Sequence, residues 1–354
     1  MRKIYNIYGT DSHLMTLKLL EAANTISLVP SGADIMLKPN LVVAGTPENG
    51  ATTHAGVLSG CIEYFRENGV NDITVAEGSW VGAGTMGAMK RAGYDEVCKR
   101  YNVPFIDLKH EKTRKIDSPI GSLEVCSRAL DADFLVNLPV LKGHCQTVMT
   151  CALKNLKGCL PDREKSRFHA LGLTRPIAAL GAVLKPKLII VDSICGDLNF
   201  EEGGNPVQTN RMFLGTDPVM IDAYGAGLMG LELSRVPYIQ IAENRGAGST
   251  KISDEDIITL NEPVNAGKYP KPSGQVAGLT RNVHEDSACS ACYAALVRAL
   301  YTERKGRSQQ IYIGQGWRGR KIPEGALGIG RCCSGAARNV KGCPPNAKDI
   351  AEMF

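Results

Sequence analysis

Long hydrophobic runs are absent from this chain of 354 residues. The starting segment MRKIYNIYG has basic residues but no continuous apolar stretch after them. No run reaches the roughly 18 apolar residues that a membrane helix needs. We therefore expect a cytoplasmic protein without a membrane partner. A chain of this length is expected to form two domains, and the size of its core is not limiting.

Interleaved aromatic residues are missing from the basic carboxyl-terminal part of the chain. The net charge is +5, yet residues 271–354 hold thirteen Lys and Arg against six Asp and Glu. A basic surface attracts nucleic acid, but this region lacks the interleaved aromatic residues of a base-stacking platform, so we do not expect that partner. The same positive charge would favour a bound group of negative charge.

Cysteine, in contrast, is abundant, and five of the twelve cysteines lie in the last sixty-six residues. So large a chain does not resemble a small secreted disulfide scaffold, and CxxC spacing in a reducing, anaerobic compartment indicates metal or redox chemistry. Gathering distant thiolates costs conformational entropy, which a bound metal offsets. The candidate metal ligands are Cys289 and Cys292 in CSAC, the pair Cys332 and Cys333, and Cys343 in KGCPP.

The spacing of these cysteines favours one [4Fe–4S] cluster, with zinc as the alternative. Paired-knuckle zinc sites use two short CxxC pairs, whereas here the second half is the adjacent pair Cys332 and Cys333 followed by Cys343. Thiolate softness suits iron–sulfur chemistry, and a proline after a cluster cysteine is typical of ferredoxin-type sites. A cluster needs four cysteine ligands, so one of the five cysteines is surplus. Either Cys332 or Cys333 is that surplus cysteine.

Short apolar runs alternate with amphipathic stretches along the chain, which is typical of an α/β fold. We predict a mostly parallel or mixed sheet flanked by helices, with a smaller C-terminal cysteine-rich α+β domain. The segment ITLNEPVNAGKYPKPSGQ indicates a linker, so the expected division is an α/β ligand-binding domain, residues 1–268, and an iron–sulfur domain, residues 269–354. The expected strands are 3–9, 34–37, 73–76, 104–108, 133–138 and 187–191, and the expected helices lie near 14–24, 54–68, 84–101 and 174–184.

Polar residues follow several of the expected strands, where open α/β sheets collect their ligands. Any one such lysine or glutamate is more often a solvated surface residue. Together, however, the set suits a small anion such as a carboxylate or phosphate, with lysine as a point charge. The candidates are Lys38 and Asn40 in LKPNLV, Glu77 in VAEGSW, Lys142 and His144 in NLPVLKGH, and Lys154 and Asn155 in ALKNLKG.

Two further polar candidates have structural alternatives. The motif TTHAG predicts that a helix starts at His54, where the histidine would cap the helix or pack against it rather than react. Asp217 precedes Pro218, a pattern typical of a helix N-cap with proline at the first helical position. The glycines of WVGAGTMG lack the GxGxxG spacing of a dinucleotide loop. Three other cysteines, expected to be reduced packing residues, are Cys145, Cys151 and Cys159.

Several of these motifs together resemble a known family. LKPNLV, TTH, NLPVLKGH, ALKNLKG, GTDPVMIDA and a cysteine-rich end with GCPP look like the uncharacterised iron–sulfur-centre family called domain of unknown function 362, over most of residues 30–250. The resemblance implies an α/β protein associated with four-iron clusters, and its GxC pattern slightly favours Cys332 over Cys333. The family's frequent ferredoxin module with closely repeated cysteines is not matched here. The resemblance implies a common site lined by Lys38, Asn40, His54, Lys142, His144, Lys154, Asn155 and Asp217.

The sequence therefore leads to a functional hypothesis and one alternative. We expect a cytoplasmic iron–sulfur oxidoreductase that couples one cluster to a small anionic substrate and takes electrons from a protein such as ferredoxin. In this hypothesis Lys142 and Lys154 bind substrate charge, and His144 or His54 moves a proton. The alternative is a non-catalytic protein. In it an iron–sulfur cluster or a zinc ion stabilises the fold of the small domain, and the first domain binds a ligand or a partner protein.

Overall fold

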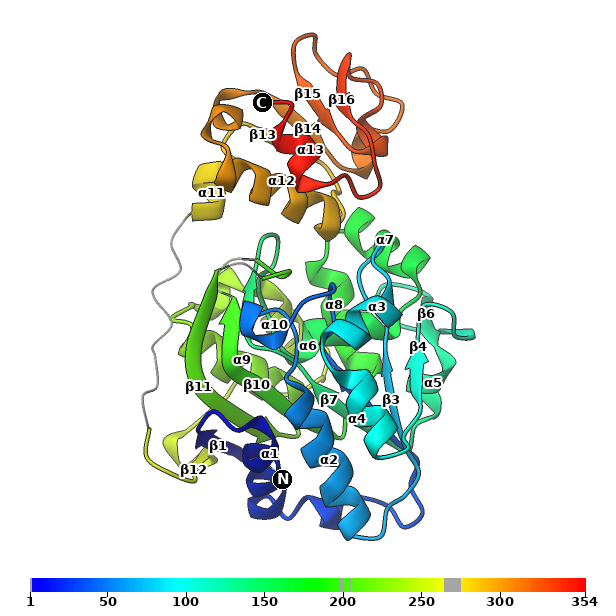
Figure 1. Ribbon diagram of the computed structural model, residues 1–354, viewed down its shortest axis with the longest axis vertical. Coiled ribbons are helices and arrows are strands. Elements are labelled where there is room, and N and C mark those ends of the chain that lie inside the picture. Colours follow the sequence, from blue (N-terminus) through cyan, green and yellow to red (C-terminus); the bar gives the residue numbers. More distant parts are fainter. Residues whose placement is uncertain (1, 198–199, 204, 264–274) are drawn as a thin grey trace.

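An eight-stranded mixed sheet organises the first three quarters of the chain (Figure 1). In this computed structural model the described residues are 2–197, 200–203, 205–263 and 275–354. Strand β11 is antiparallel to both of its neighbours, and the remaining pairings are parallel. In spatial order the strands are β12 (Ile257–Thr259), β1 (Ile4–Tyr8), β11 (Pro206–Gly215), β10 (Leu188–Asp197), β7 (Phe134–Leu138), β2 (Ile35–Pro39), β3 (Ile73–Glu77) and β4 (Phe105–Asp107).

Helices cover both faces of this sheet, because its central strands are apolar on both sides and fully buried. One face packs against α1 (Ser12–Ala22), α2 (Ala55–Glu67), α3 (Thr85–Arg91) and α4 (Tyr94–Arg100). The other face packs against α5 (Ser127–Asp131), α6 (Ala152–Asn155), α7 (Asp162–Ala170), α8 (Thr174–Val183), α9 (Pro218–Leu228) and α10 (Pro237–Asn244). The α/β class predicted from the sequence is confirmed.

Two details of this region differ from the sequence expectations. The helix expected near 84–101 is two helices, since Gly93 between α3 and α4 has a φ of +77°, which ends a right-handed helix. Strand β11 was not expected at all. Its first three residues are exposed or half-buried, and residues 208–211 are polar, so the sequence does not predict a buried strand here.

The carboxyl-terminal region has its own small sheet of four strands, all parallel. Its apolar core includes Leu296, Leu300, Ile313 and Ile329. The expected boundary between residues 268 and 269 lies outside the described ranges. The elements of this region are β13 (Val283–Glu285), β14 (Ile311–Ile313), β15 (Leu327–Ile329), β16 (Arg338–Val340), α11 (Gln275–Leu279), α12 (Ser290–Thr302) and α13 (Ala347–Ala351).

Two small hairpins belong to the first region. They are β5 (Thr113–Ile116) with β6 (Leu123–Cys126), and β8 (Lys142–His144) with β9 (Val148–Thr150).

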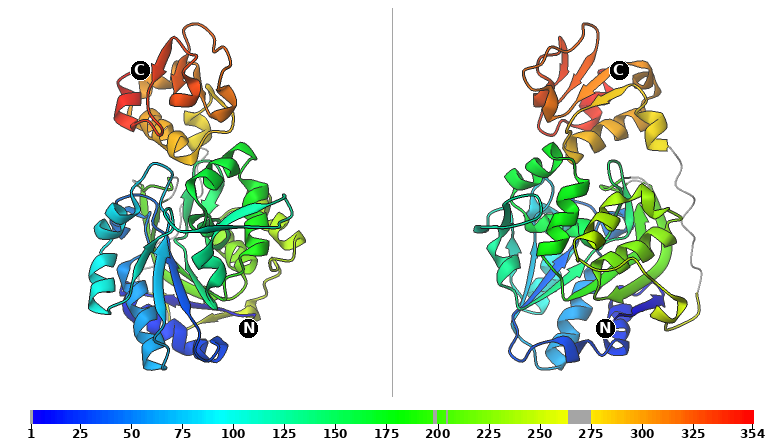
Figure 2. Two further views of the ribbon diagram at one scale, coloured as in Figure 1. Left: turned by 90° about the vertical axis from the view of Figure 1, so that its right-hand side faces the viewer. Right: turned by 180° about the vertical axis from the view of Figure 1, so that it is seen from behind.

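The carboxyl-terminal region covers the end of the large sheet at which β2, β3 and β7 finish (Figure 1), and two further views show the same placement (Figure 2). Gln146 Nε2 donates to Ala288 O at 2.9 Å across this contact. The rings of Phe200 and Tyr301 meet edge to face with centroids 5.8 Å apart. None of the helices in the described ranges is long and apolar enough to span a membrane.

Candidate functional site

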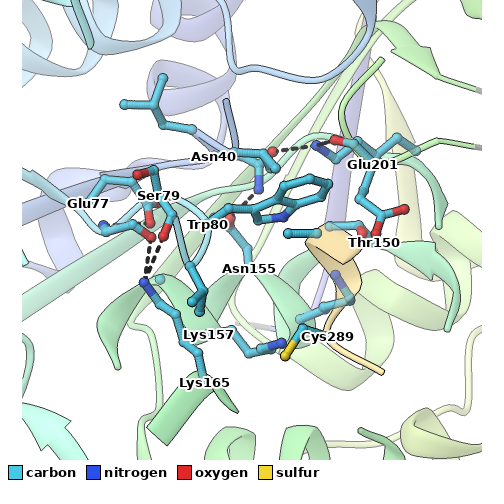
Figure 3. Close-up of a pocket in the computed structure, with 18 of the residues that line it drawn as sticks. Asn40, Glu77, Ser79, Trp80, Thr150, Asn155, Lys157, Lys165, Glu201 and Cys289 are labelled. Atoms are coloured by element: carbon cyan, nitrogen blue, oxygen red, sulfur yellow. Dashed lines mark hydrogen bonds between the residues drawn. The ribbon is translucent and has the colours of Figure 1, made fainter. Parts of the chain in front are cut away.

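A cavity of about 80 Å³ lies between the carboxyl end of the large sheet and the region that covers it. Its walls combine the segments after β2 and β3, the segment of residues 142–169, and the start of α12 (Figure 3). Asn40, Trp80, Lys154 and Glu201 contribute from the first region, and Cys289 contributes from the second. The site is therefore complete only when both regions are in contact.

A chain of amide hydrogen bonds joins three of the sequence motifs beneath the cavity. Asn40 Nδ2 donates to Asn155 Oδ1 at 2.7 Å, and Asn155 Nδ2 donates to Asn137 Oδ1 at 2.8 Å. Lys142 Nζ donates to Asn40 Oδ1 at 2.7 Å, to Glu201 O at 2.8 Å, and to the backbone carbonyl of Ala51. An ammonium has three N–H donors, so the protein itself uses all the donors of Lys142.

Two more buried lysines are likewise committed to protein acceptors. Lys38 Nζ forms an ion pair with Glu77 and also donates to Pro39 O at 3.1 Å. Burial raises the pKa of Glu77, and the Lys38 charge opposes that rise. Lys165 Nζ donates to the carbonyl oxygens of residues 78 and 79, both at 2.9 Å. These lysines fix the segment after β3 in place.

Lys154 is different, because its amine has no hydrogen-bond or ion-pair partner within the part of the chain that the structure describes. Burial lowers its pKa to about 8, against the opposing charge of Glu201. Burial and the Lys154 charge lower the pKa of Lys142 to about 7. Lys154 is thus a cation in the cavity wall that the surrounding protein leaves available to a ligand.

Lys157 and His169 form a second polar group in the same wall. Lys157 Nζ lies 3.1 Å from His169 Nε2. Burial and the Lys154 charge hold the pKa of Lys157 well below its usual value, and burial together with Lys157 does the same to the pKa of His169. Lys157 also lies close enough to Cys289 for the two side chains to affect each other's pKa, and Figure 3 shows both side chains on one side of the cavity.

His144 lies behind the cavity rather than in its wall. Its Nδ1 accepts from Gln146 N at 3.0 Å and from Thr147 N at 3.2 Å, so the neutral ring carries its proton on Nε2. Nε2 lies 3.1 Å from Glu201 Oε1. Burial and the Lys154 charge hold the pKa of His144 well below its usual value. His144 can therefore act on a ligand only through Glu201.

His54 and Asp217 are placed at helix starts and do not line the cavity. His54 Nδ1 and its backbone N both lie 2.7 Å from Asp192 Oδ2. Burial opposes the charged form of His54, but Asp192 outweighs it and the pKa is raised. Asp217 accepts from Val219 N at 2.9 Å and from Met220 N at 3.0 Å as the N-cap of α9.

The cysteine group of the carboxyl-terminal region, Cys289, Cys292, Cys332 and Cys343, gathers at one edge of the small sheet. Its members follow β13, β15 and β16, and parallel strands place their carboxyl ends at the same edge. Burial and the charges of Cys332 and Cys343 raise the pKa of Cys289 to about 11. These mutual effects show that the sulfurs share one electrostatic neighbourhood.

Hydrogen-bond donors from the loop after β14 complete this edge. Arg318 Nε donates to Cys332 Sγ at 3.3 Å, and Gln315 Nε2 donates to Cys289 Sγ at 3.6 Å. Donors of this kind stabilise the thiolate form that an iron–sulfur cluster requires. Among the described side chains, no three His, Cys, Asp or Glu residues lie close enough together to hold a single metal ion.

The side chains of Cys332 and Cys333 differ in their exposure to solvent. Cys332 is partly exposed beside Arg318, whereas Cys333 is fully buried in an apolar cluster with Tyr312 and Ile322. Burial raises the pKa of Cys333 to about 11. Of the three cysteines expected to pack, Cys151 and Cys159 are buried in the core beneath the sheet, and Cys145 is partly buried against the carboxyl-terminal core.

Sequence reasoning missed several residues of the cavity wall, namely Trp80, Lys165, His169 and Glu201. A signal for two of them exists in α7, DREKSRFHA. Its only large apolar residue, Phe168, must face the core, which places Lys165 at i−3 on the buried side, and His169 lies four residues after Lys165 on the same face of the helix. Gly82 of the WVGAGTMG motif packs closely against Pro344, since a Cβ at that position would lie 2.4 Å from Pro344 Cδ.

Comparisons with known proteins place the chain in a family. A thylakoid-associated protein, sll1697 of Synechocystis sp., is 25% identical over 252 residues, 69% of this chain and 78% of that protein. The lactate racemase apoprotein of Thermoanaerobacterium thermosaccharolyticum has a TM-score of 0.46 and 16% identity, over 64% of this chain and 56% of that one. A Thermotoga maritima protein has a TM-score of 0.39 and 11% identity, over 66% of this chain and 58% of its own. The model of the domain of unknown function DUF362 matches residues 35–227, more than half of the chain, which therefore belongs to the DUF362 family.

Proposed function

We propose that this chain is an iron–sulfur oxidoreductase in which one [4Fe–4S] cluster, held by the cysteine group, acts on a small anion bound in the cavity. The observation that carries the proposal is the composition of a single wall. Cys289 of the cysteine group and the amines of Lys154 and Lys157 line the same cavity. An anion attracted by the amines is thereby held next to a cluster ligand.

The donor set fits such a cluster. Cys289, Cys292, Cys332 and Cys343 offer soft thiolates, and Arg318 with the basic surface of residues 271–354 offsets their negative charge. When bound, a cluster of this kind supplies single electrons, or Lewis acidity where one iron has an open coordination position. Cys333 is the surplus cysteine in this assignment.

The chain's own residues bind the anion and manage its protons. Lys154 and Lys157 supply positive charge in a partly dehydrated wall, where charge interactions are stronger than in water. His169 lies in the cavity wall within hydrogen-bond distance of Lys157, so it is better placed to exchange a proton with that amine than His144 or His54, which do not line the cavity. Electrons would come from an acidic partner such as ferredoxin, attracted to the exposed Arg331 and Lys341 beside Cys343.

A structural role for the metal is the second candidate. The strands of the small sheet have only three residues each, and a small domain with so little regular structure commonly relies on a metal staple. In that case zinc or a cluster would hold the loops together, and the cavity would bind a ligand without reacting with it.

Metal analysis of protein purified without oxygen tests the proposal. We expect roughly four iron and four sulfide per chain, consistent with a four-iron cluster, and a broad visible absorption that dithionite bleaches. A colourless protein with one tightly bound zinc and no acid-labile sulfide would contradict the redox function and support the metal staple. An EPR signal after reduction separates a redox-active cluster from a redox-silent one.

A further inference from the structure

We propose that the Lys154 amine forms an imine with the carbonyl carbon of a small 2-oxo carboxylate bound in the cavity. This inference rests on the proposed function for the anion site and names its ligand class. It does not depend on the metal. Lys154 is singled out by geometry: Lys38, Lys142 and Lys165 are committed to protein acceptors, and Lys157 lies against His169.

The Lys154 amine has the surroundings of a nucleophile. It lines the cavity, is only partly exposed, and has no partner among the residues of the described ranges. Lysines reach the neutral, reactive form near neutral pH when they are desolvated or lie beside other cations. The first condition applies here, because burial desolvates the amine, and Lys142 and Lys157 lie close enough to respond to its charge.

A carboxylate beside the carbonyl group fits the remaining wall. Lys157 contributes a second amine to this wall, and α12 follows its N-cap Cys289, whose side chain makes no capping hydrogen bond. Helix N-termini and lysines both favour anions. A 2-oxo carboxylate places its carbonyl carbon and its charge on adjacent atoms. Lys154 and the wall formed by Lys157 and Cys289 can therefore be contacted by one small molecule.

The step balances without an oxidant or a reductant. The neutral amine attacks the carbonyl carbon, and a proton moves to the carbonyl oxygen, giving a carbinolamine. Loss of that oxygen as water forms the C=N bond. Lys157 and His169, hydrogen-bonded to one another, are the groups of this wall that carry the protons of both stages. The product is an iminium that withdraws electrons from the neighbouring carbon.

Reductive trapping tests this inference on the protein as purified. Glyoxylate and cyanoborohydride are added to the native protein for a short time at pH 7.5, and labelled lysines are located by peptide mass spectrometry. The neutral fraction of an amine with a pKa about two units below that of an exposed lysine is roughly a hundredfold larger. We expect labelling of Lys154 to exceed that of the exposed Lys90 by at least about tenfold.

Two comparisons make the outcome decisive. Acetaldehyde, which lacks the carboxylate, should label Lys154 roughly tenfold less than glyoxylate does, the effect of one charge contact. Lys154→Arg should abolish the label at that position, while Lys90→Arg should leave the Lys154 label unchanged. A native labelling pattern equal to that of urea-unfolded protein, or equal labelling by both aldehydes, would overturn the inference even if Lys154→Arg fails to fold.

These results also separate this inference from the proposed function. If the protein contains iron and sulfide but forms no Lys154 adduct, the cluster proposal stands and the imine proposal is wrong. If Lys154 forms the adduct in protein that contains zinc or no metal, the imine proposal stands and the proposed redox function is wrong.

Discussion

One peptide bond separates two thiols with different surroundings at Cys332 and Cys333. The Cys332 sulfur accepts a hydrogen bond from Arg318 and interacts with Cys289 and Cys292. The Cys333 side chain is fully buried among apolar residues. In the proposed function, one of these neighbours binds iron and the other packs.

The matched pair Cys332→Ser and Cys333→Ser tests this division. Cys332→Ser should lose most of the iron and visible absorption, because a serine hydroxyl is a poor cluster ligand. Cys333→Ser should keep the iron but lower the free energy of unfolding by about 1–3 kcal/mol, since it buries a hydroxyl in an apolar cluster. Iron content and thermal unfolding check both. The reverse pattern would make Cys333 the ligand.

At this scale the sequence predicts the kinds of residue but not their roles. The motifs point to Lys38, Lys142 and Lys154 together, and nothing in the spacing separates them. Their roles depend on acceptors far away in the chain, such as Glu201 O for Lys142, 59 residues distant. Pairing at that separation is decided by the tertiary fold, so the free amine of Lys154 becomes recognisable only in the structure.

Parallel pairing is the feature of the secondary structure that assembles the cysteine group. Strands β13, β15 and β16 run in one direction, so the loops that follow them meet at one edge. Strands of three residues carry too little pattern to predict this pairing from sequence. The large sheet was easier to predict, because its buried strands are longer apolar runs, whereas β11, which has polar residues at 208–211, was not predicted.

The loop after β3 meets the cysteine group at Gly82, which has a φ of +88°. Gly82→Ala should cost about 1–2 kcal/mol for the left-handed backbone, in addition to the contact with Pro344 Cδ. We expect a lower unfolding temperature and faster loss of iron to a chelator. Gly87→Ala in α3, where an added Cβ meets open space, should be neutral or slightly stabilising. Equal behaviour of the two variants would mean that the Gly82 contact does not hold the two regions together.

The whole molecule brings the anion cavity and the cysteine group together at one contact between two regions. The large sheet supplies Lys154 and Trp80, and the small sheet supplies Cys289. The sequence indicated each half separately, from strand-end polar residues and from clustered cysteines. It did not indicate that they share a wall, because that depends on how the regions dock across pairs such as Gln146 with Ala288.

The most direct test of this arrangement is the EPR spectrum of the dithionite-reduced protein with and without oxalate, a small anion that cannot form an imine. If the cluster and the anion share a cavity, saturating oxalate should shift the spectrum of the wild type, and Lys154→Met should weaken binding roughly tenfold, the effect of one lost charge contact. Lys90→Met, which removes an exposed lysine, should respond like the wild type. A reduced cluster whose spectrum is the same with and without oxalate, or a protein with no EPR signal, would contradict the account.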